Sequence, residues 1–305
     1  MDPTENNGNV TNELDKKAVF AAIIGRPNVG KSTLLNALVG EKVSIVTNKP
    51  QTTRSRVTGI LTKGDTQFVF LDTPGLHKAK DRLGAYMMKS ANSALEDTDV
   101  VIWVVPTATR PGKQEEFLAN KLKAEEKPVI LVINKTDGES AVAVGDTILA
   151  YAPLLDFASV IPASALTGKG VDIVLDELSA FAQPGGWIFD EDMITDSSQR
   201  TLAGEIIREK LLRVLNDEIP HGIAVTVEEF REKRGVCSIR AEIICEKASH
   251  KPIIIGKGGA TLKKVGTYAR EDMEKLFESR VFLDLYVRVR EGWRDGNLSK
   301  FGFDD

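Results

Sequence analysis

The sequence predicts two folded domains, a doubly wound α/β domain with a mostly parallel sheet and a smaller α+β domain after it. With 305 residues, 42% of them hydrophobic and 28% charged, the chain can bury cores for about two domains. Its first part alternates short apolar runs with helical patterns. Near residue 183 this alternation stops, and the order becomes a helix, two alternating segments, a glycine loop, a helix and a strand.

Five β-branched apolar runs in the first part predict strands that are buried on both faces of a sheet. Helical patterns separate them, among them STLLNALVG, AYMMKSANSALE and VDIVLDELSAFA. This alternation predicts right-handed strand–helix–strand units around a mostly parallel sheet. The strands are expected at residues 17–24, 68–72, 100–105, 128–134 and 158–163.

We place the first domain at residues 18–182 and the second, with a C-terminal tail, at 198–305. The segment 183–197 is the expected linker, because QPGGW and the acidic FDEDMITD interrupt the pattern. In IAVTVEEF, residues 223–230, apolar side chains alternate with smaller or polar ones. This alternation predicts that helices cover one face of the second sheet and that solvent covers the other.

The N-terminal segment and the apolar runs favour a cytoplasmic protein. Residues 1–16 are polar and lack the basic start and apolar core of a secretory signal, so a disordered tail is expected over residues 1–17. The most apolar run, at 100–105, is far shorter than the ~20 residues that span a bilayer. Cys237 and Cys245 share one face of a strand-like stretch, and buried thiols are expected there, as in a reducing compartment.

Charge is distributed unevenly between the two parts. The net charge of −4 for the whole chain does not favour nucleic acid as a partner. Residues 1–195 hold 20 Lys and Arg against 25 Asp and Glu, whereas residues 196–305 hold 20 against 19. Within the second part, residues 247–270 carry six basic side chains and no acidic one. The second domain therefore has a local basic patch.

The stretch GRPNVGKS at 25–32 predicts a phosphate-binding loop. It follows a predicted strand and opens a predicted helix, so backbone N–H groups face the phosphates at the positive end of that helix. Lys31 is expected to reach the β- and γ-phosphates, and Ser32 to supply a hydroxyl for Mg²⁺. Gly25 and Gly30 allow a tight turn and a close approach of the backbone.

The stretch LDTPG at 71–75 follows an apolar strand and predicts the γ-phosphate sensor. The carboxylate of Asp72 can hold the metal through water, and the N–H of Gly75 can meet the γ-phosphate. Alone, DTPG would be an ordinary turn at the end of a strand. Its meaning here comes from the phosphate loop that precedes it in the chain.

The stretch NKTD at 134–137 predicts selection of guanine. Asp137 can accept hydrogen bonds from guanine N1–H and the N2 amino group, which adenine lacks. Asn134 is expected to brace the loop and Lys135 to lie along the purine ring. The turn ASA at 163–165 is expected to offer a backbone N–H to guanine O6. The three motifs in this order predict GTP rather than ATP.

Over residues 18–182 these motifs resemble the small GTPase superfamily, and GRPNVGKS with QTTRSR at 51–56 resembles its bacterial Era-type branch. The resemblance implies a P-loop GTPase domain that hydrolyses GTP with Mg²⁺. Leu76 stands where Ras-like enzymes carry the glutamine that orients the attacking water, which implies slow intrinsic hydrolysis or another device.

Two further assignments rest on the same resemblance. Asn28 occupies the position at which relatives hold a potassium ion that could replace an arginine finger, with a purely structural role as the alternative. Thr53 is the expected switch threonine on Mg²⁺, and Thr52 is the alternative. Catalytic roles are expected for Lys31, Thr53, Asp72, Gly75 and Asn28. The whole nucleotide site is expected to comprise Gly25, Arg26, Pro27, Asn28, Val29, Gly30, Lys31, Ser32, Thr33, Thr52, Thr53, Asp72, Thr73, Pro74, Gly75, Leu76, Asn134, Lys135, Thr136, Asp137, Ser164 and Ala165.

The second glycine loop, GKGG at 256–259, does not fit a nucleotide site. A P-loop needs lysine and Ser/Thr after its last glycine, whereas Lys257 lies inside this loop and Ala260 follows it. The loop fits the GXXG of a KH domain, which clamps about four single-stranded nucleotides by their backbone. It joins an apolar run to a basic helix, in an α-β-β-α-α-β order. An ordinary loop is the alternative.

Phosphate contacts are predicted from Lys257, Lys263 and Lys264, together with Gly256, Gly258 and Gly259. An apolar groove for bases is expected beside the loop, at residues 253–255 and the edge of segment 237–246. These apolar residues are equally explained as core.

The stretches SQRTLAGEIIREKLLR, IIIGKGGATLKKVGTYAREDM and GWRDG resemble the C-terminal KH domain of the Era family, a type II KH domain. The resemblance implies a monomer that binds the single-stranded 3′ end of 16S rRNA and assists 30S ribosomal subunit assembly. It also permits peripheral contact with the inner face of the cell membrane.

Two other function classes compete with this interpretation. A membrane-associated signalling GTPase could use the basic patch on anionic lipid, but no lipidation motif or basic amphipathic helix supports stable anchoring. A passive RNA chaperone with a degenerate nucleotide site is opposed by the intact Lys31, Ser32, Asp72 and Asp137.

Overall fold

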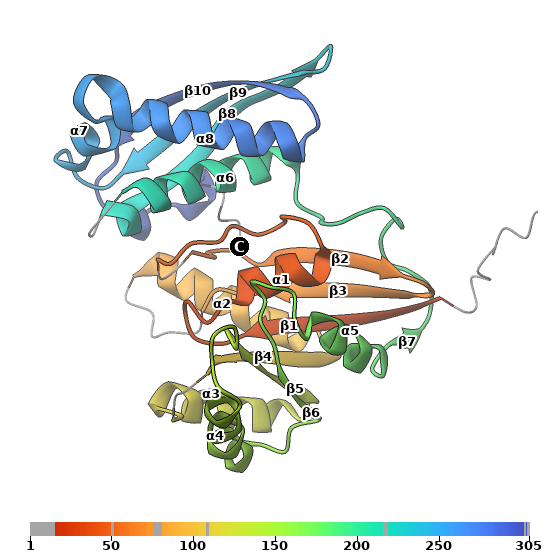
Figure 1. The fold of residues 1–305 in the computed structure, drawn as a ribbon. Coiled ribbons are helices and arrows are strands. Elements are labelled where there is room, and N and C mark those ends of the chain that lie inside the picture. The colour runs from red at the N-terminus through yellow and green to blue at the C-terminus, as the bar shows by residue number, and fades with distance from the viewer. Residues whose placement is uncertain are drawn as a thin grey trace, which may run out of the picture.

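The computed structural model describes residues 16–49, 52–75, 81–107, 110–215, 219–301 and 303. These residues form two domains, the first built on a large sheet and the second on a small one (Figure 1). Residues 1–15 of the predicted tail and Leu76 lie outside the described residues.

The first domain is built on a seven-stranded sheet with the order β2-β3-β1-β4-β5-β6, and β7 pairs with β1. Pairing is parallel except at β2 and β7. The runs expected as strands are strands, which confirms the predicted sheet. Their bounds are β1 Lys17–Ile24, β2 Val57–Lys63, β3 Thr66–Asp72, β4 Val100–Pro106, β5 Val129–Asn134, β6 Ser159–Pro162 and β7 Gln183–Pro184.

Helices cover both faces of this sheet. One core joins α1 and α5 to one face, and a second core joins α3, α4 and the end of α2 to the other. The prediction of a doubly wound domain is therefore confirmed. The bounds are α1 Lys31–Val39, α2 Arg82–Glu96, α3 Lys113–Glu125, α4 Ala141–Tyr151 and α5 Val171–Ser179.

The sheet order places a topological switch point beside β1. The chain leaves β1 for β3 on one side and later returns to β4 on the other. In such sheets ligands bind outside the carboxyl ends of the strands at this point. The segment GRPNVGKS follows β1, and DTPG and NKTD begin at the last residue of β3 and of β5, so all three share this edge.

The second domain has a three-stranded sheet of order β10-β9-β8, in which β9 is antiparallel to β8 and parallel to β10. Helices α6 and α8 pack on one face in a core that contains Cys237 and Cys245, both free and buried as predicted. The α-β-β-α-α-β order is confirmed. The bounds are α6 Gln199–Val214, β8 Ile223–Lys233, β9 Val236–Cys245, α7 His250–Ile255, α8 Ala260–Leu276 and β10 Arg280–Val289.

The other face of the small sheet is not fully solvated, which corrects the prediction from IAVTVEEF. Ala224 of β8 and Ile244 of β9 are buried there against the aromatic C-terminal segment and against α2 of the first domain. Alternation along one strand does not reveal that a distant segment covers its polar-looking face. The covering residues are Leu83, Met87, Trp293, Phe301 and Phe303.

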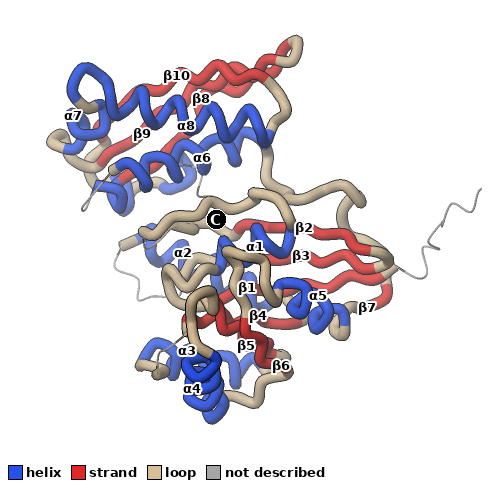
Figure 2. Tube along the Cα trace, viewed as in Figure 1, coloured by secondary structure: helices blue, strands red, loops and turns tan. Residues whose placement is uncertain are grey.

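Residues 183–197, the expected linker, run along the first domain. Strand β7 pairs with β1. The side-chain oxygen of Gln67 accepts hydrogen bonds from the N–H groups of Ile188 and Phe189 at 2.9 and 3.0 Å. Thr195 Oγ1 donates to the Thr58 carbonyl at 2.7 Å. The second domain is thereby held near β2, with α6 above the loop that follows α1 (Figure 2).

Candidate functional site

The phosphate loop is a tightly curled segment between β1 and α1. Gly25, Asn28 and Gly30 all have positive φ angles, of 147°, 65° and 100°. A Cβ atom at Gly30 would overlap the side-chain amide of Asn134, so only glycine fits there. The curl turns the loop around the start of α1, the arrangement in which backbone N–H groups bind phosphate.

Lys31 is buried, with 7% of its surface exposed, at the first position of α1. Its Nζ donates to the carbonyls of Gly25 at 3.2 Å and Arg26 at 3.0 Å, so it lies across the loop. Burial lowers the pKa of Lys31, and the nearby Asp72 carboxylate opposes that effect. A cation held here in a poorly solvated position interacts strongly with phosphate oxygens.

Ser32, Thr53 and Asp72 converge at one point. Ser32 Oγ donates to Asp72 Oδ2 at 2.6 Å and lies 3.0 Å from Thr53 Oγ1, which is 3.4 Å from the same carboxylate oxygen. Thr52 points elsewhere, because its Oγ1 donates to the Lys49 carbonyl at 2.7 Å. Of the two threonines considered, Thr53 is the one near the carboxylate. Ser44 Oγ, which the sequence did not single out, also donates to Asp72 Oδ2, at 3.3 Å.

These oxygens fit a magnesium ion. Asp72 is completely buried, and in the part of the chain that the structure describes no hydrogen bond reaches its Oδ1. Burial raises the pKa of Asp72, while Lys31 and the hydroxyls of Ser32, Ser44 and Thr53 lower it. Hard carboxylate and hydroxyl oxygens suit Mg²⁺. Ser32, Thr53 and Asp72 would hold such an ion, which would supply positive charge beside bound phosphates.

Asn134 connects the phosphate loop to the turn at 163–165. Its Nδ2 donates to the Val29 carbonyl at 2.9 Å, and its Oδ1 accepts from the Ala165 N–H at 2.9 Å. Lys135 has a positive φ of 64°, and its Nζ donates to the Asn28 carbonyl at 2.7 Å. Both side chains therefore brace the phosphate loop from the end of β5.

Asp137 is exposed at the same edge and accepts a hydrogen bond from Ser164 Oγ at 2.6 Å. The three N–H groups of the turn at 163–165 are already used by Ile133, Lys169 and Asn134. An N–H for guanine O6 therefore requires that the Ala165 donor be shared with Asn134 or released by it. The sequence could not show that competing bond, because it joins residues 31 positions apart.

The remaining predicted residues lie around this pocket. Asn28 is exposed, and its Nδ2 donates to the Asn48 carbonyl at 2.9 Å. Thr73 Oγ1 donates to the Ile23 carbonyl at 3.0 Å. Arg26 forms an ion pair with the buried Glu115. The pocket is lined by Pro27, Asn28, Gly30, Lys31, Ser32, Thr33, Ile45, Val46, Thr47, Thr52, Thr53 and Gly75.

Sequence reasoning missed the stretch 45–47 of this lining and its support by Asn36. The Oδ1 of Asn36 accepts from the N–H groups of Val43 and Ser44 at 3.0 and 2.9 Å. In the sequence, only the position of this stretch, between the first helix and the switch threonine, could have indicated that it lines the pocket. Leu76, which replaces the water-orienting glutamine, lies outside the described residues.

The GXXG loop differs from the phosphate loop in exposure. Gly256 and Gly258 have positive φ angles of 76° and 59°, and Gly259 is the left-handed N-cap of the 17-residue helix α8. Lys257, Lys263 and Lys264 are all exposed. The loop thus presents backbone N–H groups, the positive end of a long helix and exposed cations to solvent.

A groove runs beside this loop between α8 and β10. It is lined by Gly259, Leu262, Lys263, Gly266, Thr267, Arg270, Val281, Phe282, Leu283 and Leu285. Phe282 is 65% exposed, although it is a large apolar side chain. The prediction of a groove at the edge of segment 237–246 was wrong, because β9 is the central strand and β10 forms the edge. Strand order is a long-range property that local patterns do not fix.

The fold and its two loops define a P-loop GTPase domain joined to a KH domain. A family model for a 50S ribosome-binding GTPase matches residues 20–135, and a KH domain model matches residues 218–294. The chain is 46% identical to the GTPase Era of Clostridium botulinum (strain Loch Maree), over 94% of this chain and 98% of that protein. It is 47% identical to the GTPase Era of Clostridium kluyveri, over 94% and 99%. The chain therefore belongs to the Era family and is a GTPase.

Solved structures agree with this assignment. A variant of Aquifex aeolicus Era bound to GDP·AlF4⁻ has a TM-score of 0.90 and 38% identity, and the match covers 95% of this chain and 100% of that one. A structure of Era in complex with MgGDPNP and nucleotides 1506–1542 of 16S ribosomal RNA has a TM-score of 0.89 and 37% identity, with the same coverage.

Proposed function

We propose that this GTPase binds the single-stranded 3′ end of 16S rRNA through its KH domain and assists assembly of the 30S subunit. The observation that carries the proposal is the exposed GXXG loop, free of acidic neighbours from residue 247 to 270, beside an open groove. The related Era structure that contains nucleotides 1506–1542 of 16S rRNA supports this choice of RNA.

In this proposal the KH domain holds the RNA in two ways. Lys257, Lys263 and Lys264 contact phosphates together with the N–H groups at the start of α8, contacts that do not depend on sequence. Bases enter the groove between α8 and β10, where the exposed ring of Phe282 offers a stacking surface. In this proposal, selectivity for the RNA sequence therefore comes from the groove.

The GTPase half of the proposal assigns Mg²⁺ to Ser32, Thr53 and Asp72, and guanine to Asp137. The related structure with MgGDPNP supports a magnesium-bound nucleotide. Asn28 is assigned to a potassium ion beside the phosphates, which would supply the positive charge that other GTPases take from an arginine finger. Such a device would offset the absence of glutamine at position 76.

We further propose that the nucleotide state controls the grip on RNA. The second domain contacts the loop that follows α1, through ion pairs between Lys42 and both Glu209 and Asp272. GTP orders such loops by contacts to its γ-phosphate, and hydrolysis removes those contacts. The protein acts as a monomer in the cytoplasm in this proposal, where its rRNA partner is made. No helix in the described ranges is long and apolar enough to cross a membrane.

Crosslinking to RNA in each nucleotide state tests the proposal. The full chain is crosslinked to total RNA with GDP or with a non-hydrolysable GTP analogue, and the contacts are mapped. We expect contacts between the KH loop and the 3′ end of 16S rRNA that differ between the two states. A dispersed map would reject the rRNA assignment, and identical maps and affinities in both states would reject the nucleotide control.

The potassium assignment has its own test. Hydrolysis is measured in K⁺ and in Na⁺ at fixed ionic strength, for the wild type and for Asn28→Ala. We expect faster hydrolysis in K⁺ for the wild type and no difference for the variant. Equal wild-type rates in the two salts would reject the potassium site.

A further inference from the structure

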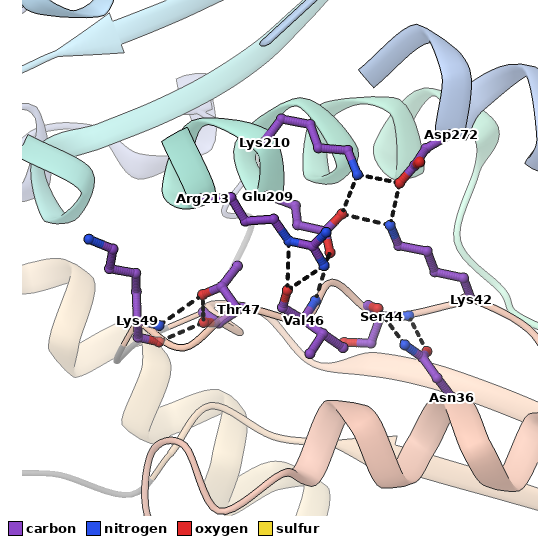
Figure 3. Close-up of polar contacts among 11 residues, drawn as sticks. Asn36, Lys42, Ser44, Val46, Thr47, Lys49, Glu209, Lys210, Arg213 and Asp272 are labelled. Atoms are coloured by element: carbon purple, nitrogen blue, oxygen red, sulfur yellow. Dashed lines mark hydrogen bonds and ion pairs between the residues drawn. The ribbon is translucent and has the colours of Figure 1, made fainter. Parts of the chain in front are cut away.

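The loop that carries Thr53 is bound by the KH domain along much of its length. We call residues 41–56, between α1 and β2, the switch loop; all but residues 50 and 51 are described. Glu209 of α6 is fully buried and holds the first part of this loop. Its carboxylate accepts from Lys42 Nζ at 2.6 Å and from the Val46 N–H at 3.2 Å (Figure 3). Arg213, one turn further along α6, donates to the Val46 carbonyl at 3.0 Å.

The two neighbours of Thr53 are held separately. Arg208 of α6, 3% exposed, donates from its guanidinium to the carbonyl of Thr52. Arg54, also 3% exposed, donates to the Ile223 carbonyl at 2.6 Å and lies over the ring of Trp293. One residue before Thr53 and one residue after it are therefore attached to the second domain.

Both attachments are of a kind that fixes geometry. A guanidinium is planar and donates in fixed directions. Arg208 Nη2 donates both to the Thr52 carbonyl and to Glu205 Oε2, the latter at 2.6 Å, and Arg208 Nε donates to Glu205 Oε1 at 2.9 Å. Burial lowers the pKa of Arg54 to about 9, with further lowering from the positive charge of Arg208 and raising from Glu205. A guanidinium buried in this way needs its carbonyl partner.

We propose that Arg208 is a positioning residue for GTP hydrolysis: from the KH domain it fixes the peptide that places Thr53 beside Ser32 and Asp72. The inference rests on the proposed magnesium role of Thr53. It goes beyond that role because it assigns part of the GTPase machinery to the RNA-binding domain. A displacement of about 1 Å at a reacting centre can cost about 100-fold in rate, so the loss of such an anchor has a measurable effect.

The same contacts extend toward the RNA loop. Asp272 lies on α8, the helix that begins at GXXG, and accepts from Lys42 at 2.7 Å and from Lys210. Burial would raise the pKa of Asp272, but the hydrogen bonds from Lys210 and Lys42 outweigh it and hold the pKa below its usual range. The carboxylate is thus charged at neutral pH. Through it, the helix that would hold RNA phosphates at one end contacts the switch loop further along.

The first test compares Arg208→Ala with Arg208→Lys in the full chain. For Arg208→Ala we expect kcat to fall about tenfold and the Mg²⁺ needed for half-maximal rate to rise about fivefold, with the KM for GTP within about twofold. Without nucleotide or metal, amide hydrogen exchange over residues 44–49 and 52–56 is expected to become about tenfold faster, because the anchor no longer restrains them. Arg208→Lys keeps a cationic donor for the Thr52 carbonyl but loses the planar fork, so it should recover only part of both effects.

A control separates positioning from general stability. Arg240 pairs with Asp284 at an exposed site on the KH sheet, away from the switch loop, and Arg240→Ala should leave kcat and switch-loop exchange unchanged. If Arg208→Ala instead lowered RNA affinity and melting temperature in parallel with kcat, a structural role would be shown and the proposal overturned. Unchanged switch-loop exchange with kcat within twofold would also overturn it.

A double-mutant cycle decides whether Arg208 acts through Thr53. In a Thr53→Ala background we expect Arg208→Ala to have no further effect on kcat, because the group that it positions is gone. Additive losses would overturn the proposal even if both single variants were slow. The RNA affinity of the wild type is measured in parallel and does not depend on the outcome of the cycle. A failure of the rRNA assignment would therefore be distinguished from a failure of the positioning role of Arg208.

Discussion

The two glycine loops of this chain use the same residue types in opposite ways. In the phosphate loop, Lys31 is buried and bonded across the loop, and Asn134 and Lys135 brace the backbone from another strand. In the GXXG loop, Lys257 is exposed and a Cβ at Gly258 would meet only open space. The phosphate loop is thus braced around a buried lysine, whereas the GXXG loop lies open on the surface.

The difference fits the ligands that are proposed for the two loops. A nucleotide of fixed size can be surrounded, so its site gains from preorganised donors, buried charges and distant carboxylates. A polymer must enter sideways and continue past the site, so its backbone is held by solvated cations and N–H groups at an open surface. Glycine serves close approach in both loops, and the surroundings decide the ligand.

The largest expected effect is that of Lys31→Ala. Removal of the buried cation should lower GTP hydrolysis by roughly 10³-fold, because its charge acts in a poorly solvated site on the transferring phosphoryl group. Hydrolysis is measured by phosphate release. RNA affinity in the absence of nucleotide, measured by fluorescence anisotropy, should remain unchanged.

Lys63, exposed at the end of β2, provides the matched control, and Lys63→Ala should keep full activity. If a Lys31→Ala protein still hydrolysed GTP at a tenth of the normal rate, hydrolysis would not depend on the buried lysine. The contrast drawn between the two loops would then fail.

The second effect tests the exposed end of the nucleotide site, where guanine is proposed to bind Asp137. Asp137→Asn replaces two acceptors with one donor and one acceptor, which suits xanthine better than guanine. We expect GTP affinity to fall by roughly 10²-fold or more while XTP binding appears, since mismatched polar groups at a recognition site are strongly rejected. Competition of GTP and XTP against a fluorescent nucleotide measures the change. A loss of GTP affinity with no gain of XTP binding would indicate local damage rather than altered selection.

Much of this arrangement was predictable because it is local in the chain. The strand ends at Asp72 and Asn134, the phosphate loop and the GXXG loop are continuous segments, and parallel strands bring their carboxyl ends to one edge. The burial of β1 and β4 on both faces follows from their unbroken apolar runs.

Most of the unpredicted features join distant residues. Strand β2 is an exception: it is a partly polar edge strand of seven residues that forms a hairpin with the next strand, β3. Arg208 and Thr52 are separated by 156 positions, and Arg54 and Ile223 by 169. A basic side chain in a helical pattern looks solvated in sequence, and only docking of the two domains gives it a buried partner.

The third prediction distinguishes two glycines within the GXXG loop. A Cβ at Gly256 would lie 2.7 Å from the backbone nitrogen of Thr261 at the start of α8, whereas a Cβ at Gly258 would meet nothing. Gly256→Ala should therefore distort the helix start and weaken RNA binding roughly tenfold, while Gly258→Ala should cost only about 1 kcal/mol for a left-handed backbone. Anisotropy titrations and thermal melts of both variants measure this, and a larger effect at Gly258 would contradict it.

The smallest effect per residue should come from the exposed lysines, and it carries the clearest signature of an open surface. Lys257→Ala or Lys263→Ala should weaken RNA binding about threefold to fivefold, because each removes one solvated phosphate contact. The slope of log affinity against log salt should become shallower by about 0.7 for each lysine, and hydrolysis without RNA should not change. Lys275→Ala, exposed near the far end of the same helix, is the matched control and should leave the slope intact. If the slope stayed constant in the loop variants while affinity fell, these lysines would act by fixing the conformation of the loop, as Lys31 does where it bonds across the phosphate loop. The contrast between the two loops would then fail.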